Sequence, residues 1–591
     1  MPTYKAPLHE ITFLLDDLLD VGQLAALPGL AEATPEMIHA VLAEGARLCE
    51  EVLAPINLSG DAEGCRVENG AVVTPAGFKE AYTAYVNGGW PAMSASEEYG
   101  GQGLPRLVRF IFNELLYSAN LSFGMYPELA HGATSLLERW GSDELKARFL
   151  QKLIDGSWTG TMCLTEAHAG TDLGMIRTRA VPNDDGSYAI TGTKIFISAG
   201  DHDLTDNIIH LVLAKLPDAP AGTKGISVFL IPKRIPDANG VAGAPNGVHV
   251  GSIEHKMGIK ANATCVLNFD GARGWLVGEP HKGMRAMFTM MNSARLGVGM
   301  QGLGLAEVSY QNALSYAKER IQGRALAGAR NPHEEADPII VHPDVRRMLM
   351  TMKAYVEGSR ALAYWIGLLI DVEERHPDAE QRAEATDLVA LMTPILKAFL
   401  TDVGFEVTNL ALQVYGGHGY IREYGMEQFV RDARIAQIYE GTNGVQAMDL
   451  IGRKIPEGDG RLVKRFFALV SRDLEAASKV GRASDIAAPV ADALGRLQRV
   501  TMGTMARAQR DPDELGAAAT ELLRMYGLVA TGWMWARIAV VAAGRPGDDR
   551  SEEKLATARF YVSKILPQIR ALEVQIEAGA APLMGLEAAA L

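Results

Sequence analysis

The 591-residue sequence has few cysteines, and none of them are spaced like metal ligands. Its four cysteines, Cys49, Cys65, Cys163 and Cys265, form no C-x-x-C pair and have no clustered histidines beside them. Zinc sites use closely spaced cysteine and histidine ligands, and small disulfide-stabilised folds need a higher cysteine content. The sequence therefore predicts no metal site, free thiols and a cytoplasmic location.

Long apolar runs and an excess of basic charge are also missing. One of the longest apolar runs, 388–395, contains threonine and proline and is shorter than the roughly 20 residues of a membrane-spanning helix. Residues 1–5 contain no charged segment that leads into an apolar run, so we expect no signal peptide. The net charge of −14 argues against nucleic acid as a partner.

Nucleotide-binding glycine motifs are either absent or in the wrong context. No G-x-x-x-x-G-K-[ST] sequence occurs. Residues 297–302 match G-x-G-x-x-G, but that fingerprint requires a preceding strand, and here a methionine-rich helical pattern runs through the glycines. We expect Gly299 and Gly302 to permit close packing of helices instead.

Hydrophobic periodicity divides the chain into four regions, in keeping with a length that is too great for one core. Residues 1–157 have helical spacing, 158–280 alternate with the period of strands, and 281–458 are helical again. Residues 459–591 form a further helical domain, and the fold class is therefore α+β. The expected strands are Thr159–Leu164, Tyr188–Ser198, Ile208–Ala214, Ile226–Ile231, Val248–Ile253 and Thr264–Phe269.

The segment from Gln413 to Gln446 combines a glycine pair with a carboxylate in apolar surroundings. Gly416 and Gly417 would allow a ligand to approach the backbone closely. An apolar wall disfavours the charged form of a carboxylate, so Glu440 can hold a proton near neutral pH and act as a base. An ordinary glutamate at the C-terminal cap of a helix is the alternative interpretation.

These residues resemble the C-terminal signature of the acyl-CoA dehydrogenases. The resemblance implies the acyl-CoA dehydrogenase fold, with an N-terminal helical domain, a middle antiparallel β-domain and a C-terminal helical bundle, followed here by an extra C-terminal helical domain. It also implies FAD as cofactor, an acyl-CoA substrate, an electron-transfer flavoprotein as acceptor, and a homodimer with a shared FAD site. The matching positions are Gln413-x-x-Gly416-Gly417-x-Gly419-Tyr420, Arg431-Asp432 and Tyr439-Glu440-Gly441-Thr442.

The resemblance also implies a mechanism and a set of substrate contacts. Glu440 would remove the α-proton of the thioester, and flavin N5 would accept the β-hydride. The Glu440 N–H and an FAD ribityl hydroxyl would donate hydrogen bonds to the thioester oxygen, where enolate charge develops. Asn292 stands where the family usually has aspartate. Arg295 would orient Glu440 or bind the CoA side. The alternative for Arg295 is a surface or capping role. The implied substrate contacts are Thr171, Asn292, Arg295, Tyr439 and Gly441.

Two segments of the β-region resemble flavin-binding segments of the family. Residues 162–172 match a strand and loop, and 194–198 match a segment that usually reads Lys-x-Trp-Ile-Thr. Phe196 and Ser198 keep an aromatic face and a hydroxyl donor there. A hairpin turn and an ordinary strand are the alternatives. Arg320 lies in a segment similar to Arg-x-x-Phe-Gly, without the usual Phe. The implied FAD contacts are Met162, Leu164, Thr165, Gly170, Thr171, Phe196, Ser198, Arg320, Gln413, Gly417 and Thr442.

An extra N-terminal helix, which starts at residues 4–8, and the extra C-terminal domain resemble a narrower group, the 3-methylmercaptopropionyl-CoA dehydrogenases of bacterial dimethylsulfoniopropionate catabolism. This implies 3-methylmercaptopropionyl-CoA as substrate and methylthioacryloyl-CoA as product. A fatty acyl-CoA dehydrogenase of β-oxidation, an acyl-CoA oxidase, and a non-catalytic flavoprotein with a nucleic-acid-binding C-terminal domain are the alternatives. The last of these has little support, because residues 460–591 contain 18 basic against 15 acidic side chains.

Overall fold

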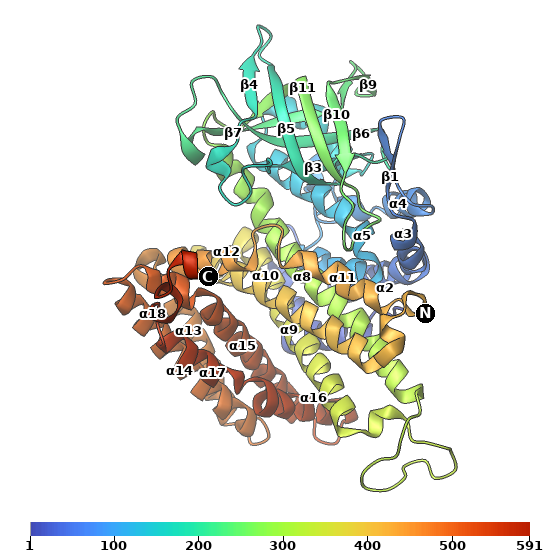
Figure 1. Cartoon of the computed structure of the whole chain (residues 1–591), viewed down its shortest axis with the longest axis vertical. Coiled ribbons are helices and arrows are strands. Elements are labelled where there is room, and N and C mark those ends of the chain that lie inside the picture. The colour runs from blue at the N-terminus through green and yellow to red at the C-terminus, as the bar shows by residue number, and fades with distance from the viewer. Residues whose placement is uncertain (1) are drawn as a thin grey trace. The chain divides into compact units, whose positions relative to one another are not determined.

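The computed structural model describes residues 2–591, which divide into two compact units. Unit 1 is helical and contains residues 2–43, 105–114 and 298–591. Unit 2 contains residues 44–104 and 115–297, including the large β-sheet (Figure 1). Three helices continue from one unit into the other: α2 (Pro35–Leu48), α5 (Arg106–Trp140) and α8 (Gly283–Glu319).

Unit 2 is built on a seven-stranded sheet with the order β10-β11-β5-β4-β6-β3, in which β7 also pairs with β11 and β6. Two short hairpins, β1–β2 and β8–β9, accompany it. The strands are β1 (Arg66–Glu68), β2 (Ala71–Val73), β3 (Trp158–Cys163), β4 (Arg179–Pro182), β5 (Tyr188–Ser198), β6 (Asn207–Lys215), β7 (Ile226–Pro232), β8 (Arg234–Pro236), β9 (Ala242–Pro245), β10 (Val248–Ile253) and β11 (Thr264–Val277). Its shorter helices are α3 (Asn57–Glu63), α4 (Phe78–Asn87), α6 (Asp143–Leu145), η7 (Lys146–Leu150) and α7 (Gln151–Ile154).

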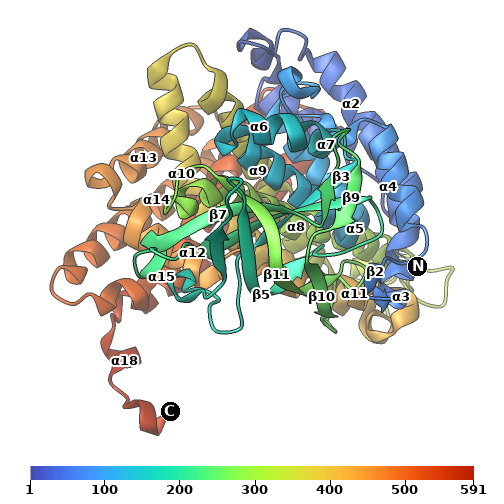
Figure 2. The same ribbon diagram turned by 90° about the horizontal axis from the view of Figure 1, so that it is seen from above.

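The predicted α+β class is confirmed, with one correction to the sheet. Strands β10, β11 and β5 pair antiparallel and run side by side in Figures 1 and 2, but β3 and β6 pair in parallel. Strands β4 and β5 lie between β3 and β6 in the chain, and this long connection allows parallel pairing where a tight hairpin does not. The predicted antiparallel domain is therefore a mixed sheet. Strand β11 also continues to Val277, beyond the predicted end at Phe269.

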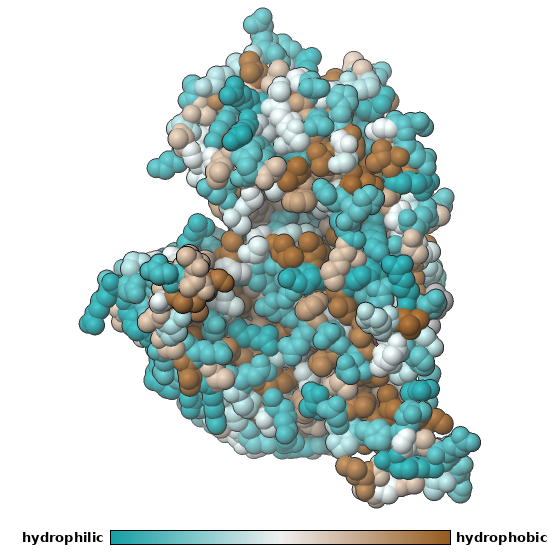
Figure 3. Space-filling model, in the orientation of Figure 1, coloured by the Kyte–Doolittle hydropathy of each residue, from teal (hydrophilic) through white to brown (hydrophobic). Residues whose placement is uncertain are grey.

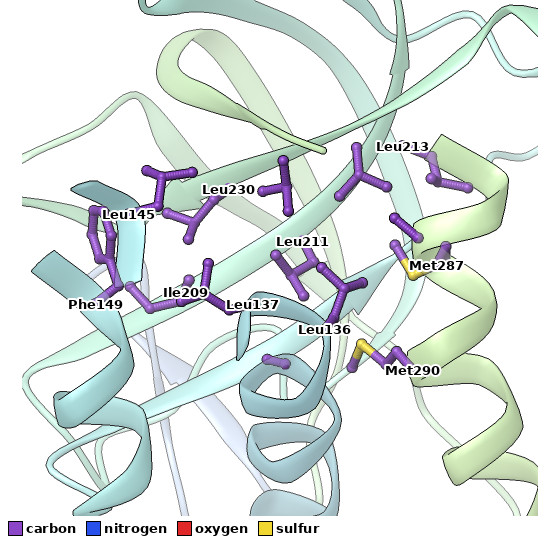
Figure 4. Close-up of a cluster of buried hydrophobic side chains, with 14 of the residues drawn as sticks. Leu136, Leu137, Leu145, Phe149, Ile209, Leu211, Leu213, Leu230, Met287 and Met290 are labelled. Atoms are coloured by element: carbon purple, nitrogen blue, oxygen red, sulfur yellow. The ribbon is translucent and has the colours of Figure 1, made fainter. Parts of the chain in front are cut away.

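The core of unit 2 lies on both faces of this sheet. In β6, Ile209, Leu211 and Leu213 point into one buried cluster, whereas Val212 and Ala214 belong to a second. This alternation is the two-residue period of a strand. Helices cover the first face, and Figure 4 shows α5, η7 and the start of α8 packing on β6 and β7. The side chains labelled there are Leu136, Leu137, Leu145, Phe149, Ile209, Leu211, Leu213, Leu230, Met287 and Met290.

Unit 1 is a bundle of long helices, and α8 packs closely on α10 within it. A Cβ on Gly302 would lie 2.4 Å from the Leu400 carbonyl oxygen, and one on Gly299 would lie 3.3 Å from that of Leu396. The predicted packing role of these glycines is confirmed. The further helices are α1 (Leu8–Thr12), α9 (Pro343–Arg375), α10 (Ala379–Tyr415), α11 (Met426–Ala436), α12 (Asn443–Asp449), α13 (Glu457–Ser478), α14 (Ser484–Ala508), α15 (Asp513–Ala543), α16 (Asp549–Phe560), α17 (Gln568–Glu577) and α18 (Ala581–Met584).

The C-terminal helices surround α15, and α18 extends away from them in Figure 2. Two helical segments, residues 379–420 and α15, are long enough and on average apolar enough to cross a membrane. Neither contains an uninterrupted apolar run of that length. Most of each apolar window, 78% and 83%, is buried inside the protein, as in core helices. On the face drawn in Figure 3, mainly hydrophilic residues cover the C-terminal helices.

A buried cluster of ion pairs and one pair with an exposed arginine join the N-terminal helical segment to the C-terminal helices within unit 1. Lys554 of α16 is 2% exposed and pairs with Glu10 of α1 and, at 2.9 Å, with Glu357 of α9. Arg545 donates a hydrogen bond of 2.8 Å to Asp17. The two extensions of the chain therefore stabilise each other.

Candidate active site

The end of β3 and the loop after it, in unit 2, contain five of the residues predicted to hold a flavin. Thr165 is half-buried, whereas Gly170 and Thr171 are exposed. A Cβ on Gly170 would have no atom within 4 Å, so the loop presents open backbone at this point. Met162 and Leu164 are half-buried at the strand end and pack against the first hydrophobic cluster.

A buried ion pair fixes the shape of this loop. Lys194 of β5 is fully buried, and its Nζ donates hydrogen bonds to the Leu164 carbonyl oxygen at 3.0 Å and to Glu166 Oε1 at 2.9 Å. The Glu166 carboxylate also accepts hydrogen bonds from the backbone N–H groups of Arg177 and Thr178. Although burial opposes ionisation, the Lys194 charge and these donors lower the pKa of Glu166 to about 2. Sequence reasoning did not assign Glu166 a role.

A β-bulge turns Phe196 out of the sheet. The register between β5 and β11 shifts, so that Ile197 pairs with Cys265 while Lys194 pairs with Leu267. Phe196 lies in this bulge with φ of 58°, in the left-handed region that side chains with a Cβ rarely adopt. The residue is 60% exposed. The alternative of a regular alternating strand is therefore wrong at this point. The exposed Phe196 lies two residues before the half-buried Ser198.

In unit 1, Glu440 lies in a strained turn between α11 and α12. Glu440 has φ of 56° and Gly441 has φ of 86°, so two consecutive residues are left-handed. Thr442 caps α12 by accepting a hydrogen bond from the Val445 N–H at 3.2 Å. Helix α11 already ends at Ala436, so Glu440 is not a capping residue of that helix. Left-handed conformations of non-glycine residues cluster at functional sites.

A polar network on one face of α10 fixes this turn. Lys397 is fully buried, and its Nζ donates hydrogen bonds to the Gly441 carbonyl oxygen at 2.8 Å and to Asn443 Oδ1 at 2.9 Å. Asp402 Oδ1 accepts hydrogen bonds from Gln437 and Asn443 side chains, both at 2.7 Å. Sequence reasoning missed these residues, although a lysine in the apolar pattern of α10 is a signal that could have found one of them.

Tyr439, which precedes the carboxylate, is half-buried, and its hydroxyl donates a hydrogen bond to Gln301 of α8. Gln301 is 3% exposed and was another residue that the sequence did not single out. Arg431 and Asp432 stay within α11, where Arg431 pairs with Glu427 and Asp432 accepts a hydrogen bond from Gln428. These contacts give the charged pair a structural role within the helix.

The remaining predicted residues lie outside the flavin loop and the Glu440 turn. Arg320, Gln413 and Gly417 of unit 1 are exposed. In unit 2, Arg295 is buried and Asn292 is exposed. The structure places the other predicted residues in two sets. The flavin-loop set of unit 2 is Met162, Leu164, Thr165, Gly170, Thr171, Phe196 and Ser198, and the turn set of unit 1 is Tyr439, Glu440, Gly441 and Thr442. Among residues 2–591, no group of three or more histidine, cysteine, aspartate or glutamate side chains is arranged to hold a metal ion.

Comparison with known families matches four consecutive regions of the chain. Residues 38–157, 161–272 and 281–455 match the N-terminal, middle and C-terminal domains of acyl-CoA dehydrogenase, respectively. Residues 464–587 match a family described as acetyl-CoA dehydrogenase C-terminal like. Together these matches cover most of the chain.

Full-length relatives and solved structures show the same likeness. The 3-methylmercaptopropionyl-CoA dehydrogenase of Ruegeria pomeroyi is 44% identical over 96% of this chain and 97% of its own length. A broad-specificity linear acyl-CoA dehydrogenase of Mycobacterium tuberculosis is 35% identical over the full length of both chains. The structure of an acyl-CoA dehydrogenase from Bacillus anthracis, complexed with FAD, aligns with a TM-score of 0.75 at 20% identity, covering 92% of this chain and 88% of that one.

Proposed function

The chain belongs to the acyl-CoA dehydrogenase family, whose members are FAD-dependent oxidoreductases, and we propose that Glu440 is its catalytic base. The reaction would oxidise an acyl-CoA thioester between its α and β carbons. The observation that carries this assignment is the left-handed turn at Glu440, held by the buried Lys397 and Asn443. Strain of this kind persists only where surrounding contacts maintain it.

The flavin-loop set fits FAD. An exposed aromatic ring at Phe196, the half-buried hydroxyls of Thr165 and Ser198, and the open backbone at Gly170 provide a stacking face and hydrogen-bonding groups. FAD bound there would supply an acceptor for the β-hydride. Thr171, Met162 and Leu164 belong to the same loop and strand end and are proposed contacts too.

Glu440 would take the α-proton of the thioester as the β-hydride leaves. The α-proton of a free thioester is only weakly acidic. Binding must therefore narrow the difference between the pKa of the Glu440 carboxyl group and that of the α-carbon, and must place the carboxylate next to the α-proton. The turn contributes the placement, because α10 contacts the Gly441 carbonyl oxygen and the side chains of Gln437 and Asn443, on both sides of Glu440. Tyr439, Gly441, Asn292 and Arg295 are the proposed substrate contacts.

We propose 3-methylmercaptopropionyl-CoA as the substrate, with methylthioacryloyl-CoA as the product, in dimethylsulfoniopropionate catabolism. The 44% identity to the Ruegeria pomeroyi relative over nearly the whole chain supports this choice. The 35% identical relative that acts on linear acyl-CoAs supports the alternative of a fatty acyl-CoA substrate.

The test is flavin reduction in a single turnover by a panel of thioesters, from 3-methylmercaptopropionyl-CoA and butyryl-CoA to palmitoyl-CoA. The proposal predicts the fastest bleaching with the short thioether substrate. Rapid bleaching by long chains alone would contradict this substrate and place the enzyme in fatty acid oxidation.

We further propose an electron-transfer flavoprotein as acceptor, a cytoplasmic homodimer, and an FAD site that the partner subunit completes through Arg320, Gln413 and Gly417. The exposure of these three residues in the single chain supports a shared site. An acyl-CoA oxidase would pass electrons to oxygen. Anaerobic bleaching followed by admission of air distinguishes the two, because slow reoxidation that an electron-transfer flavoprotein accelerates is expected only of the dehydrogenase.

The alternative of a nucleic-acid-binding C-terminal domain gains no support from its charged side chains. Arg482 pairs with Glu552, Arg496 with Glu573, and other arginines of these helices also face carboxylates. Paired arginines contribute less to phosphate binding than free ones. A structural role for these helices, stabilised by contacts with the N-terminal helix, is the proposal that the ion pairs favour.

A further inference from the structure

A buried lysine lies next to the turn that carries Glu440. Lys397 is on α10 and is 0% exposed. Moving an ammonium group out of water is unfavourable unless hydrogen bonds compensate it. Two of its hydrogen bonds go to the turn itself, to the Gly441 carbonyl oxygen at 2.8 Å and to Asn443 Oδ1 at 2.9 Å. The burial of this charge is therefore coupled to the conformation of the turn.

Different contacts hold the two ends of the turn and its middle. Its two ends are joined by the Asn443 N–H, which donates to the Gln437 carbonyl oxygen at 3.0 Å, and by Asp402, which accepts from both side chains. The middle of the turn is held differently. Gln446 Nε2 reaches the carbonyl oxygens of Glu440 and Gly441 only at 3.4 Å, so the Lys397 contact with Gly441 is the shorter one.

The middle of the turn is also where the backbone is most strained. Glu440 is left-handed at φ of 56°, a conformation that its Cβ disfavours. Gly441 follows at φ of 86°, a conformation that glycine adopts without steric strain. Without a strong donor to the Gly441 carbonyl, the Glu440 peptide is free to relax to a right-handed conformation, and this rotation would redirect the carboxylate.

We propose that Lys397 is a positioning residue for Glu440: its ammonium holds the left-handed turn so that the carboxylate meets the α-proton of the substrate. This inference rests on the proposed role of Glu440 as base. Lys397 acts through the Gly441 carbonyl and needs no contact with the substrate or the flavin. Loss of Lys397 should therefore slow proton abstraction without weakening substrate binding.

The variant Lys397→Met tests the proposal, because it keeps the length of the side chain and removes its charge and donors. Anaerobic single-turnover flavin reduction is measured with α-protiated and α-dideuterated butyryl-CoA, alongside the binding constant of the thioester. A misplacement of about 1 Å costs roughly 10²-fold, so we expect a fall of about 10- to 100-fold in the rate constant. We also expect unchanged thioester affinity and a larger α-deuterium isotope effect, because proton abstraction becomes more rate-limiting.

Lys554→Met is the matched control, since Lys554 is also buried but pairs with Glu357 and Glu10 in another part of unit 1. It should lower the unfolding midpoint and leave the rate constant of the folded fraction unchanged. If Lys397→Met does not fold, Lys397→Gln, which keeps a donor but loses the charge and some length, should show the same slower rate constant.

Three results would overturn the inference in distinguishable ways. A wild-type rate constant in the Lys397 variants, with only the amplitude or the unfolding midpoint reduced, would make Lys397 merely structural. A lower rate constant with an unchanged isotope effect and weaker thioester binding would assign it to the substrate site instead. A wild-type protein that no thioester reduces would remove the proposed function together with this inference.

Discussion

The Nζ atom of Lys194 lies 2.9 Å from Oε1 of Glu166, and both side chains are almost fully buried. This pair connects β5, which carries Phe196, to the loop that carries Thr165 and Thr171. The two parts of the proposed flavin site are thus fixed to each other by this buried ion pair, together with the hydrogen bond that the Ile195 N–H donates to the Thr165 carbonyl oxygen at 3.0 Å.

Replacing Lys194 with methionine should weaken FAD binding. The change leaves Glu166 buried with its charge uncompensated and frees the Leu164 carbonyl from its donor. A hydrogen bond to a charged group contributes about 1.5–3 kcal/mol, so the dissociation constant of FAD should rise by roughly 10- to 100-fold. Titration of the apoprotein with FAD, followed by flavin fluorescence, measures the change.

Lys233→Met provides the control for this experiment. Lys233 also pairs with a buried carboxylate in unit 2, that of Asp201, but it does not contact the loop. Its variant should bind FAD like the wild type. Equal weakening in both variants would show that general destabilisation, and not the loop, controls the affinity.

Two buried histidines predict a specific dependence of stability on pH. His202 shares a hydrogen bond with the Thr159 hydroxyl at 2.8 Å, and His210 shares one with the Thr161 hydroxyl at 2.7 Å. Burial, assisted by the Lys233 charge, lowers the pKa of each histidine to about 3. In the unfolded chain a histidine has a pKa of about 6.5. Between these values the unfolded state binds more protons, so stability is complete above pH 6.5 and is lost as the pH falls toward 3.

Urea unfolding at pH 7 and pH 5 measures this effect. Each histidine should remove about 2 kcal/mol of unfolding free energy at pH 5, and the double variant His202→Gln/His210→Gln should lose correspondingly less between the two pH values. His249→Gln, at an exposed position, should keep the wild-type difference. An identical pH dependence in the double variant would contradict the assignment.

A buried cluster in unit 1 predicts a large loss of stability on a single change. Arg360 of α9 donates hydrogen bonds to Glu114 at 2.8 Å and 2.7 Å and also pairs with Glu307. The variant Arg360→Met would leave two buried carboxylates without their cation, which costs roughly 3–5 kcal/mol. Chemical denaturation measures the unfolding free energy.

Arg347→Met is the control on the same helix. Arg347 pairs with Asp344 at 2.9 Å, but both side chains are more than half exposed. Exposed pairs contribute at most about 1 kcal/mol, so this variant should be close to the wild type. Similar losses in the two variants would show that burial does not set the strength of these pairs.

Sequence periodicity predicted much of the fold because burial is periodic. Strand β5 begins and ends at the predicted residues. The core strands differ from prediction by one residue, at both ends of β6 and at the C-terminal end of β7. The parallel pairing of β3 with β6 could not be predicted, since strand direction depends on the path of the connection and not on the pattern within each strand.

The candidate site was predicted from local motifs, and its supporting residues were not. Phe196 and Glu440 were identified by their sequence context, but the left-handed backbone of both depends on partners far along the chain. Cys265 and Leu267 set the bulge at Phe196, and Lys397 fixes the turn after Glu440. Contacts between residues so distant in sequence leave no signal in a spacing pattern.

The most direct test of the account is single-turnover flavin bleaching by Glu440→Gln beside the wild type. The amide keeps the shape of the side chain and its backbone conformation but cannot accept the α-proton, and general bases contribute about 10²- to 10⁴-fold. We expect bleaching slower by at least roughly 10²-fold, with FAD content unchanged and with wild-type bleaching in the exposed control Glu423→Gln. Bleaching of Glu440→Gln at the wild-type rate would contradict it.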